Sequence, residues 1–211
     1  MNRRTFVMSA SAAAVVPLVP AGAQRLGRTP GQILGPYYPV VKPRDRDIDL
    51  TSVDGRSGRA AGRIIRVAGR VLDQAGMPMP GVELEIWQAD TNGHYAHPSD
   101  KSAGARDPNF QGYATLRSRA DGSYSFTTIR PGPYRDDGAG GMRAPHIHFQ
   151  VTGPANRLVT QMYFEGEALN GSDRILAFAQ GNRERLIARV ASGAGPGAMD
   201  AAEWDIIVRN A

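Results

Sequence analysis

Short segments of alternating apolar and polar residues, separated by turns, dominate the sequence from residue 63 onward. The 211 residues include 25 glycines and 15 prolines, a turn-rich composition that favours many short strands over long helices. Strands are predicted at 64–72, 82–87, 112–117, 123–128, 146–152, 158–164 and 204–208, and short helices at 172–178 and 183–190. Such a series of short strands predicts an all-β domain, built as an antiparallel β-sandwich.

The N-terminal residues 1–23 have the features of a twin-arginine signal peptide. Arg3 and Arg4 precede an apolar stretch, and small residues at 21–23 fit a cleavage site. The apolar stretch is too short for a good membrane span. We therefore predict a periplasmic or secreted protein without a membrane span, although a frayed N-terminal tail is the alternative reading. Residues 24–62, whose periodicity is weak, are predicted to form an extended arm in front of one domain at 63–211.

Charge and cysteine content exclude several classes of function. The formal net charge of +5 falls to +3 when the predicted signal peptide is removed, and the remaining Lys and Arg residues are scattered. This pattern gives no indication of nucleic-acid binding. The chain has no cysteine, so disulfides, thiolate metal sites and cysteine nucleophiles are excluded. Any metal must be bound by His, Tyr, Asp or Glu.

Two of the four histidines, His146 and His148, lie in the predicted strand 146–152. Side chains two residues apart point to the same face of a strand, so the two imidazoles are expected side by side. Ile147 and Phe149 then face the opposite way, into a core. Two imidazoles on one face make a good metal-binding pair, although a structural pair of histidines fits the spacing about equally well.

Further ligands are needed to complete a metal site, and tyrosine is the remaining candidate. Tyr95 follows the predicted strand 82–87, and Tyr134 lies in a Pro-Gly-Pro-Tyr turn after the predicted strand 123–128. Spacing alone does not select them, because half-buried aromatic residues are common.

Several separate motifs, in the same order, resemble the intradiol ring-cleavage dioxygenase family, and in particular its protocatechuate 3,4-dioxygenase β subunits. The resemblance runs from about Asp47 to Val208. Its motifs are Gly69, Gly76, Leu84-Glu85-Ile86, Gly93 and Tyr95; Asp107–Phe110; Thr128–Tyr134; Arg143–Phe149; and Gln161–Gly166.

The resemblance implies a non-haem iron(III) enzyme that cleaves a protocatechuate-like catechol between its two hydroxyls with O₂, giving a cis,cis-muconate. It implies that Tyr95, Tyr134, His146 and His148 bind the iron, and that Tyr134 dissociates when substrate binds. Arg143 matches an arginine that stabilises negative charge on the substrate. Gln161 matches a glutamine in the pocket beyond the ligands.

The sequence departs from the family pattern next to these residues. A loop at 135–141 replaces an aromatic and basic stretch, Met142 stands where tryptophan is usual, and Ala144-Pro145 reverses the usual order. These changes put recognition of a benzoate carboxylate in doubt, although Arg135 could meet one. The arm at 29–38 resembles the family's α subunit, so we hypothesise a homo-oligomer in which the arm lines a site; a plain packing arm is the alternative.

Two other readings remain at this point. Parts of the sequence also resemble non-catalytic, transthyretin-like β-sandwich binding modules, but such a module has no reason to carry Tyr134, Arg143, His146 and His148 together. Zinc or copper could replace iron, although two tyrosines as ligands argue against both.

Overall fold

The computed structural model describes residues 25–136, 138, 140–154, 156–195 and 198–209, so the predicted signal peptide lies outside the described residues. The strands are β1 (Ile64–Leu72), β2 (Glu83–Trp87), β3 (Tyr113–Arg117), β4 (Ser123–Ile129), β5 (Tyr134–Asp136), β6 (Gly141–Arg143), β7 (His146–Thr152), β8 (Arg157–Phe164), β9 (Ile187–Ala191), β10 (Asp200–Glu203) and β11 (Ile206–Ile207). The short helices are η1 (Ala168–Gly171), α1 (Arg174–Ala177) and η2 (Gln180–Leu186).

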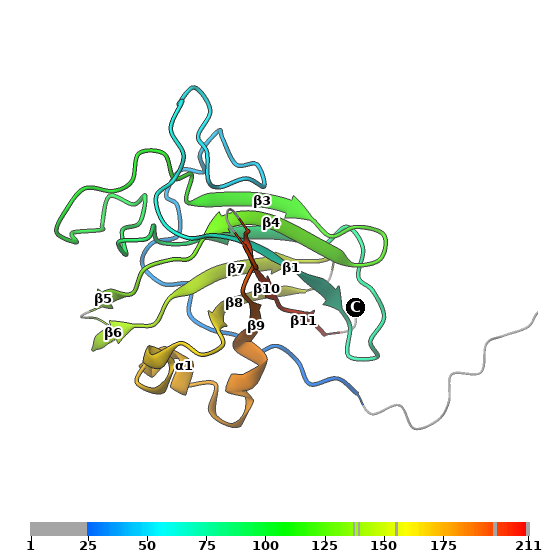
Figure 1. The fold of residues 1–211 in the computed structure, drawn as a ribbon. Coiled ribbons are helices and arrows are strands. Elements are labelled where there is room, and N and C mark those ends of the chain that lie inside the picture. Colours follow the sequence, from blue (N-terminus) through cyan, green and yellow to red (C-terminus); the bar gives the residue numbers. More distant parts are fainter. Residues whose placement is uncertain (1–24, 137, 139, 155, 196–197, 210–211) are drawn as a thin grey trace, which may run out of the picture.

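The sheet is mixed and nearly closed, so the predicted antiparallel, transthyretin-like sandwich is wrong. Within the described residues, nine strands form one sheet in the order β11-β1-β10-β9-β8-β7-β2-β3, with β4 paired to β1. The pairs β1–β10, β1–β11 and β8–β9 are parallel. In Figure 1, β9 and β10 connect the side of the molecule that carries β4 with the side that carries β7 and β8. One curled sheet therefore encloses the core, instead of two separate sheets.

Local alternation predicted the central strands well, but not the C-terminal part of the chain. The strands at 64–72 and 146–152 agree with β1 and β7. The predicted helix 183–190 is wrong, because η2 ends at Leu186 and β9 begins at Ile187. Of the predicted strand 204–208, only Ile206–Ile207 form a strand, β11, and β10 ends before it at Glu203. The loop expected at 135–141 belongs to the β5–β6 hairpin.

Two apolar clusters divide the interior. The larger one fills the curled sheet and includes Ile147 and Phe149, as the alternation predicted. The smaller one is aromatic and consists of buried Trp87, Ala89, Tyr95, Tyr113 and Tyr134. Leu34, Tyr37 and Tyr38 of the N-terminal arm pack against this second cluster.

The arm is attached to the sheet by polar contacts with a buried carboxylate. Glu85 on β2 is 3% exposed and accepts hydrogen bonds from Tyr38 Oη at 2.6 Å and Tyr113 Oη at 2.8 Å. Lys42 Nζ of the arm lies 2.9 Å from the same carboxylate. These contacts bring the arm to the end of β2 where the aromatic cluster lies. Across the described part of the chain, no helix is both long enough and apolar enough to cross a membrane.

Candidate metal centre

The structure places His146 and His148 side by side on β7. Their Nε2 atoms are 3.1 Å apart. His146 Nδ1 lies 2.7 Å from the carbonyl oxygen of Ala144, which can only accept, so we assign the proton to Nδ1 and a free lone pair to Nε2. Burial, together with the nearby Arg143, lowers the pKa of His146 well below its ordinary value. Burial also lowers the pKa of His148, with contributions from His146 and Arg143, so both imidazoles are neutral.

Tyr95 reaches the histidine pair from the loop after β2, and Tyr134 from the start of β5. The ring centroid of Tyr134 is 5.6 Å from that of His146, and the Tyr95 centroid is 6.1 Å from that of His148. The two tyrosine rings are 5.3 Å apart and nearly perpendicular. The four side chains predicted as ligands therefore converge on one point at the end of β2 and β7.

Gly93 allows the two tyrosine loops to approach each other. Its φ is +85°, in the left-handed region that favours glycine. A Cβ at this position would lie 2.5 Å from the carbonyl oxygen of Pro133 and 3.1 Å from Tyr134 Cβ. The buried Asp90 carboxylate holds the same turn by accepting hydrogen bonds from the backbone N–H groups of Asn92 and His94. The loop that carries Tyr95 thus lies directly against the turn that carries Tyr134.

The four side chains fit a bound metal ion. Two imidazole nitrogens that bind one ion at about 2.1 Å and at a right angle would be about 3.0 Å apart, close to the 3.1 Å between these Nε2 atoms. The buried Tyr95 Oη has no hydrogen-bond partner, a costly arrangement that a cation would relieve. Within the described residues, no three His, Cys, Asp or Glu side chains form a metal-binding group, so both tyrosines are needed.

Burial affects the protonation of both tyrosines. Burial raises the pKa of Tyr95 well above its ordinary value, and the neighbouring Tyr134 adds to this. Burial raises the pKa of Tyr134 to about 12, although Arg143 partly offsets the effect. Without a cation both phenols therefore keep their protons. Phenolate and imidazole together form a hard, anionic ligand set that suits ferric iron.

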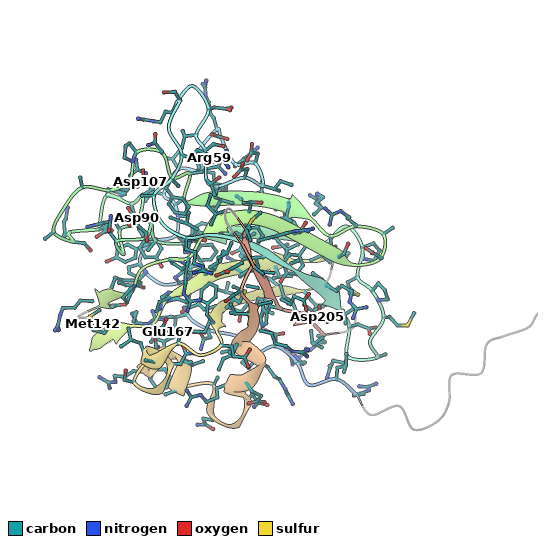
Figure 2. The ribbon with its side chains drawn as sticks, viewed as in Figure 1. Arg59, Asp90, Asp107, Met142, Glu167 and Asp205 are labelled. Atoms are coloured by element: carbon teal, nitrogen blue, oxygen red, sulfur yellow. The ribbon has the colours of Figure 1, made fainter. Side chains whose placement is uncertain are left out.

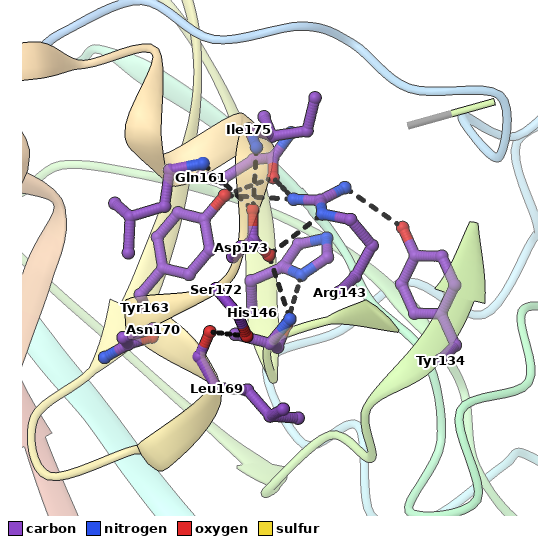
Figure 3. Close-up of polar contacts among 12 residues, drawn as sticks. Tyr134, Arg143, His146, Gln161, Tyr163, Leu169, Asn170, Ser172, Asp173 and Ile175 are labelled. Atoms are coloured by element: carbon purple, nitrogen blue, oxygen red, sulfur yellow. Dashed lines mark hydrogen bonds and ion pairs between the residues drawn. The ribbon is translucent and has the colours of Figure 1, made fainter. Parts of the chain in front are cut away.

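Arg143 lies beside Tyr134, and Gln161 lies beside the guanidinium of Arg143 (Figure 3). Arg143 is 2% exposed, and its Nη1 donates to Tyr134 Oη at 3.4 Å. Its Nη2 donates to Gln161 Oε1 at 2.6 Å and to Tyr163 Oη at 3.0 Å. The β5–β6 pairing places Arg143 directly opposite Tyr134. A buried, oriented positive charge is thus fixed beside one of the candidate ligands.

The arm of the same chain covers this centre. A Cβ on Gly35 would lie 3.2 Å from His148 Cε1, so the arm backbone runs directly against the imidazole. Tyr37 stacks on Tyr95 with a centroid distance of 4.6 Å. Gln161 Nε2 donates to the carbonyl oxygen of Ile33 at 3.0 Å. The hypothesis that the arm lines a site therefore has a geometric basis within one chain.

Sequence reasoning missed three residues that complete the centre. Trp87 stacks on His148 with a centroid distance of 4.8 Å and an angle of 13°. Tyr163 and Asp173 both hydrogen-bond to Arg143. Tyr163 lies two residues after Gln161 on β8, and this alternation could have identified it.

Comparisons with known proteins agree with this centre and this fold. Residues 33–210 match the Dioxygenase family. The chain is 38% identical over 160 residues to the protocatechuate 3,4-dioxygenase beta chain of Burkholderia cepacia, covering 72% of this chain and 68% of the relative. It is 33% identical over 160 residues to a hydroxyquinol 1,2-dioxygenase of Nocardioides simplex, covering 70% of this chain but only 51% of that relative. The chain thus spans about half the length of some relatives.

Solved structures share the fold. The dioxygenase domain of a dioxygenase–carbohydrate-binding fusion protein from a Streptomyces species is 31% identical, with a TM-score of 0.66 over 88% of this chain and 100% of that one. A 3-chlorocatechol 1,2-dioxygenase from Rhodococcus opacus has a TM-score of 0.68 over 90% of this chain and 75% of that one. At 23% identity, the second structure supports the fold alone.

The mixed sheet and the family match together define the class as a ring-cleaving dioxygenase. The chain belongs to the Dioxygenase family, and its relatives are intradiol ring-cleaving enzymes. The predicted family and enzyme class, an intradiol aromatic ring-cleavage dioxygenase, are confirmed.

Proposed function

We propose that this chain cleaves a catechol between its two hydroxyls with O₂, using iron(III) bound by Tyr95, Tyr134, His146 and His148. The observation that carries the proposal is the convergence of these four buried side chains, with two Nε2 atoms 3.1 Å apart and a Tyr95 Oη that has no partner. The chemistry that ferric iron supplies when bound is withdrawal of electron density from a chelated diol, which opens a ring carbon to O₂.

The residues around the metal would accept a proton from the diol and stabilise negative charge. Once released from the metal, a phenolate at Tyr134 Oη would accept a proton from the incoming diol, since burial raises the pKa of the free phenol to about 12. Arg143 Nη1 donates to that oxygen and can stabilise its negative charge. Because the guanidinium is buried and fixed, it stabilises negative charge that develops on the substrate without reorganising. Gln161 holds the guanidinium on its other side.

A cavity of about 250 Å³ beside Tyr95 supports a single-ring substrate. Its lining is mainly aromatic and aliphatic and includes Tyr37, Trp87 and Gln111. The buried Trp87 Nε1 has no acceptor, and the buried Gln111 Oε1 has no donor. One donor and one acceptor in an apolar cavity suit a ring that carries hydroxyl groups. Arg106, which also lines the cavity, is a cation that could meet a carboxylate such as that of protocatechuate.

Product analysis tests the reaction class. The iron-loaded protein is incubated with catechol or protocatechuate under ¹⁸O₂, and the product is examined by mass spectrometry. A cis,cis-muconate carrying two oxygen atoms from O₂ is expected. Cleavage outside the pair of hydroxyls would contradict the intradiol reaction, and unchanged diol would contradict the proposal and favour a non-catalytic binding module.

We also propose that the arm contributes to the site and that the chain acts as a homo-oligomer. The contacts of Gly35 and Tyr37 support the first point. Deleting residues 25–40 is expected to abolish turnover, whereas full turnover would mean that the arm only packs. Light scattering of the iron-loaded protein measures the oligomeric state, and a monomer would contradict the second point.

Export by the twin-arginine route is a separate proposal, supported by Arg3 and Arg4 at the start of residues 1–23. A fluorescent reporter fused after residue 23 should reach the periplasm, and replacing both arginines by lysine should retain it in the cytoplasm. Equal export of both fusions would contradict this route.

A further inference from the structure

A fully buried ion pair lies next to the candidate metal centre (Figure 3). Asp173 Oδ2 accepts a hydrogen bond from Arg143 Nε at 3.0 Å, and the two side chains are 0% and 2% exposed. Asp173 precedes α1, whereas Arg143 is the last residue of β6. The pair therefore joins two elements that are 30 residues apart in sequence.

Each carboxylate oxygen of Asp173 accepts two hydrogen bonds. Oδ2 also accepts from the backbone N–H of Ala144 at 2.9 Å. Oδ1 accepts from the N–H groups of Ile175 and Leu176, each at 2.9 Å, and so caps α1. Three backbone donors from two segments thus fix the carboxylate in position. Among the described residues, the only charged partner of this rigid acceptor is Arg143.

Two nitrogens of the Arg143 guanidinium are held by neighbouring side chains, and the third points to Tyr134. Nε is held by Asp173, and Nη2 is held by Gln161 and Tyr163. Nη1 is the nitrogen directed at Tyr134 Oη. Because a guanidinium is planar and its donors form a rigid fork, the position of Nε sets the direction of Nη1.

We propose that Asp173 is a positioning residue for the ring-cleavage reaction, which directs Arg143 Nη1 toward Tyr134 Oη. The inference rests on the proposed function. Asp173 does not touch the metal or the substrate, so it acts only through Arg143. Its loss should therefore lower kcat more than it raises KM, because the charge stabilised by Arg143 develops during the reaction.

Two variants separate this role from the capping of α1. In Asp173→Ser the hydroxyl can still cap α1, but the charge and the second oxygen are lost. Asp173→Asn keeps the shape but places an amide donor against the donors Arg143 Nε and Ala144 N–H. Asp200→Asn is the matched control, because Asp200 is a buried aspartate paired with an arginine, Arg63, on a different part of the sheet.

The test compares the iron-loaded full chain and its variants in single-turnover and steady-state assays, with thermal unfolding of each. We expect kcat to fall at least tenfold in both Asp173 variants and to stay within about twofold in Asp200→Asn, whose partner Arg63 is 60% exposed. A double-mutant cycle with Arg143→Met should show that Asp173→Ser has almost no further effect once Arg143 is absent. A crystal structure of metal-free Asp173→Ser should show Nη1 turned away from Tyr134 Oη.

The possible outcomes are distinct. If the wild-type chain is active but Asp173→Ser retains its kcat, or if the two substitutions have additive effects on kcat, the positioning role is wrong. An unmoved Arg143 in the crystal structure would also overturn it, independently of activity. If the iron-loaded wild-type chain itself shows no ring cleavage, the proposed function fails first.

Discussion

Replacing Gly35 with alanine perturbs the contact between the N-terminal arm and His148. Gly35 has φ +77°, where a residue with a Cβ loses about 1–2 kcal/mol. The added Cβ would lie 3.2 Å from His148 Cε1, closer than the optimum of about 3.5–4.0 Å between carbon atoms. The imidazole or the arm must therefore move by a few tenths of an ångström.

Gly55→Ala is the matched control for this substitution. Gly55 has the same φ of +77°, but a Cβ there would have no neighbour within 4 Å. Both variants should lose the stability that a Cβ at positive φ costs. For a domain of this size, each kcal/mol corresponds to a decrease in Tm of about 2–4 °C. Gly35→Ala should lose about 1 kcal/mol more through overpacking.

The two variants should differ more in their affinity for ferric iron than in Tm. Displacement of a ligand by its surroundings typically costs about 10–100-fold in affinity, so we expect at least a tenfold weaker ferric iron affinity for Gly35→Ala and none of this loss for Gly55→Ala. Competition with a chelator measures the affinity, and circular dichroism measures Tm. If the two variants are equal in both measurements, the arm does not press on His148 and the reasoning is wrong.

Three further predictions follow from buried polar atoms. Tyr95→Phe should abolish iron binding without destabilising the metal-free protein, because Tyr95 Oη has no hydrogen-bond partner. The control Tyr124→Phe breaks a 2.7 Å hydrogen bond to the Trp204 carbonyl. It should lose about 1 kcal/mol of stability in urea unfolding and keep its iron. The reverse pattern would contradict the ligand assignment. Burial raises the pKa of Glu85, but hydrogen bonds from two tyrosines and a lysine outweigh this effect and lower the pKa below its ordinary value. The ionised carboxylate therefore stabilises the fold above its unfolded pKa of about 4.3. This contribution is lost as the pH falls through the folded pKa. Glu85→Gln should flatten the acid side of the urea-midpoint profile, and an unchanged profile would refute this. Gln111→Leu should raise KM for catechol with little change in kcat in oxygen-uptake assays; an unaltered KM would place the substrate outside the 250 Å³ cavity.

The sequence was informative where structure depends on nearby residues. Alternation identified β1 and β7, and the two-residue spacing placed His146 and His148 side by side. The motif resemblance supplied Tyr95 and Tyr134, which spacing alone could not select. Tyr95 comes from a loop and Tyr134 from the start of the short strand β5, and their approach depends on the turn at Gly93.

Pairing between distant segments could not be read from the sequence. The strand β9 was missed because 183–190 does not alternate clearly, and its parallel partner β8 begins 30 residues earlier. This non-local pairing converts the expected sandwich into one mixed sheet. Asp173 was missed for a similar reason, since its role is visible only in its contact with Arg143. The division into arm and domain and the roles of the site residues stay predictions.

The visible spectrum of the iron-loaded protein, recorded without O₂ before and after adding catechol, tests the central claim most directly. Two phenolate ligands on ferric iron predict a red-brown charge-transfer band that is lost in Tyr95→Phe and shifts to longer wavelength when catechol binds. A protein that stays colourless after ferric reconstitution, or a band that catechol does not change, would contradict the assignment of Tyr95, Tyr134, His146 and His148 as the metal centre of an intradiol dioxygenase.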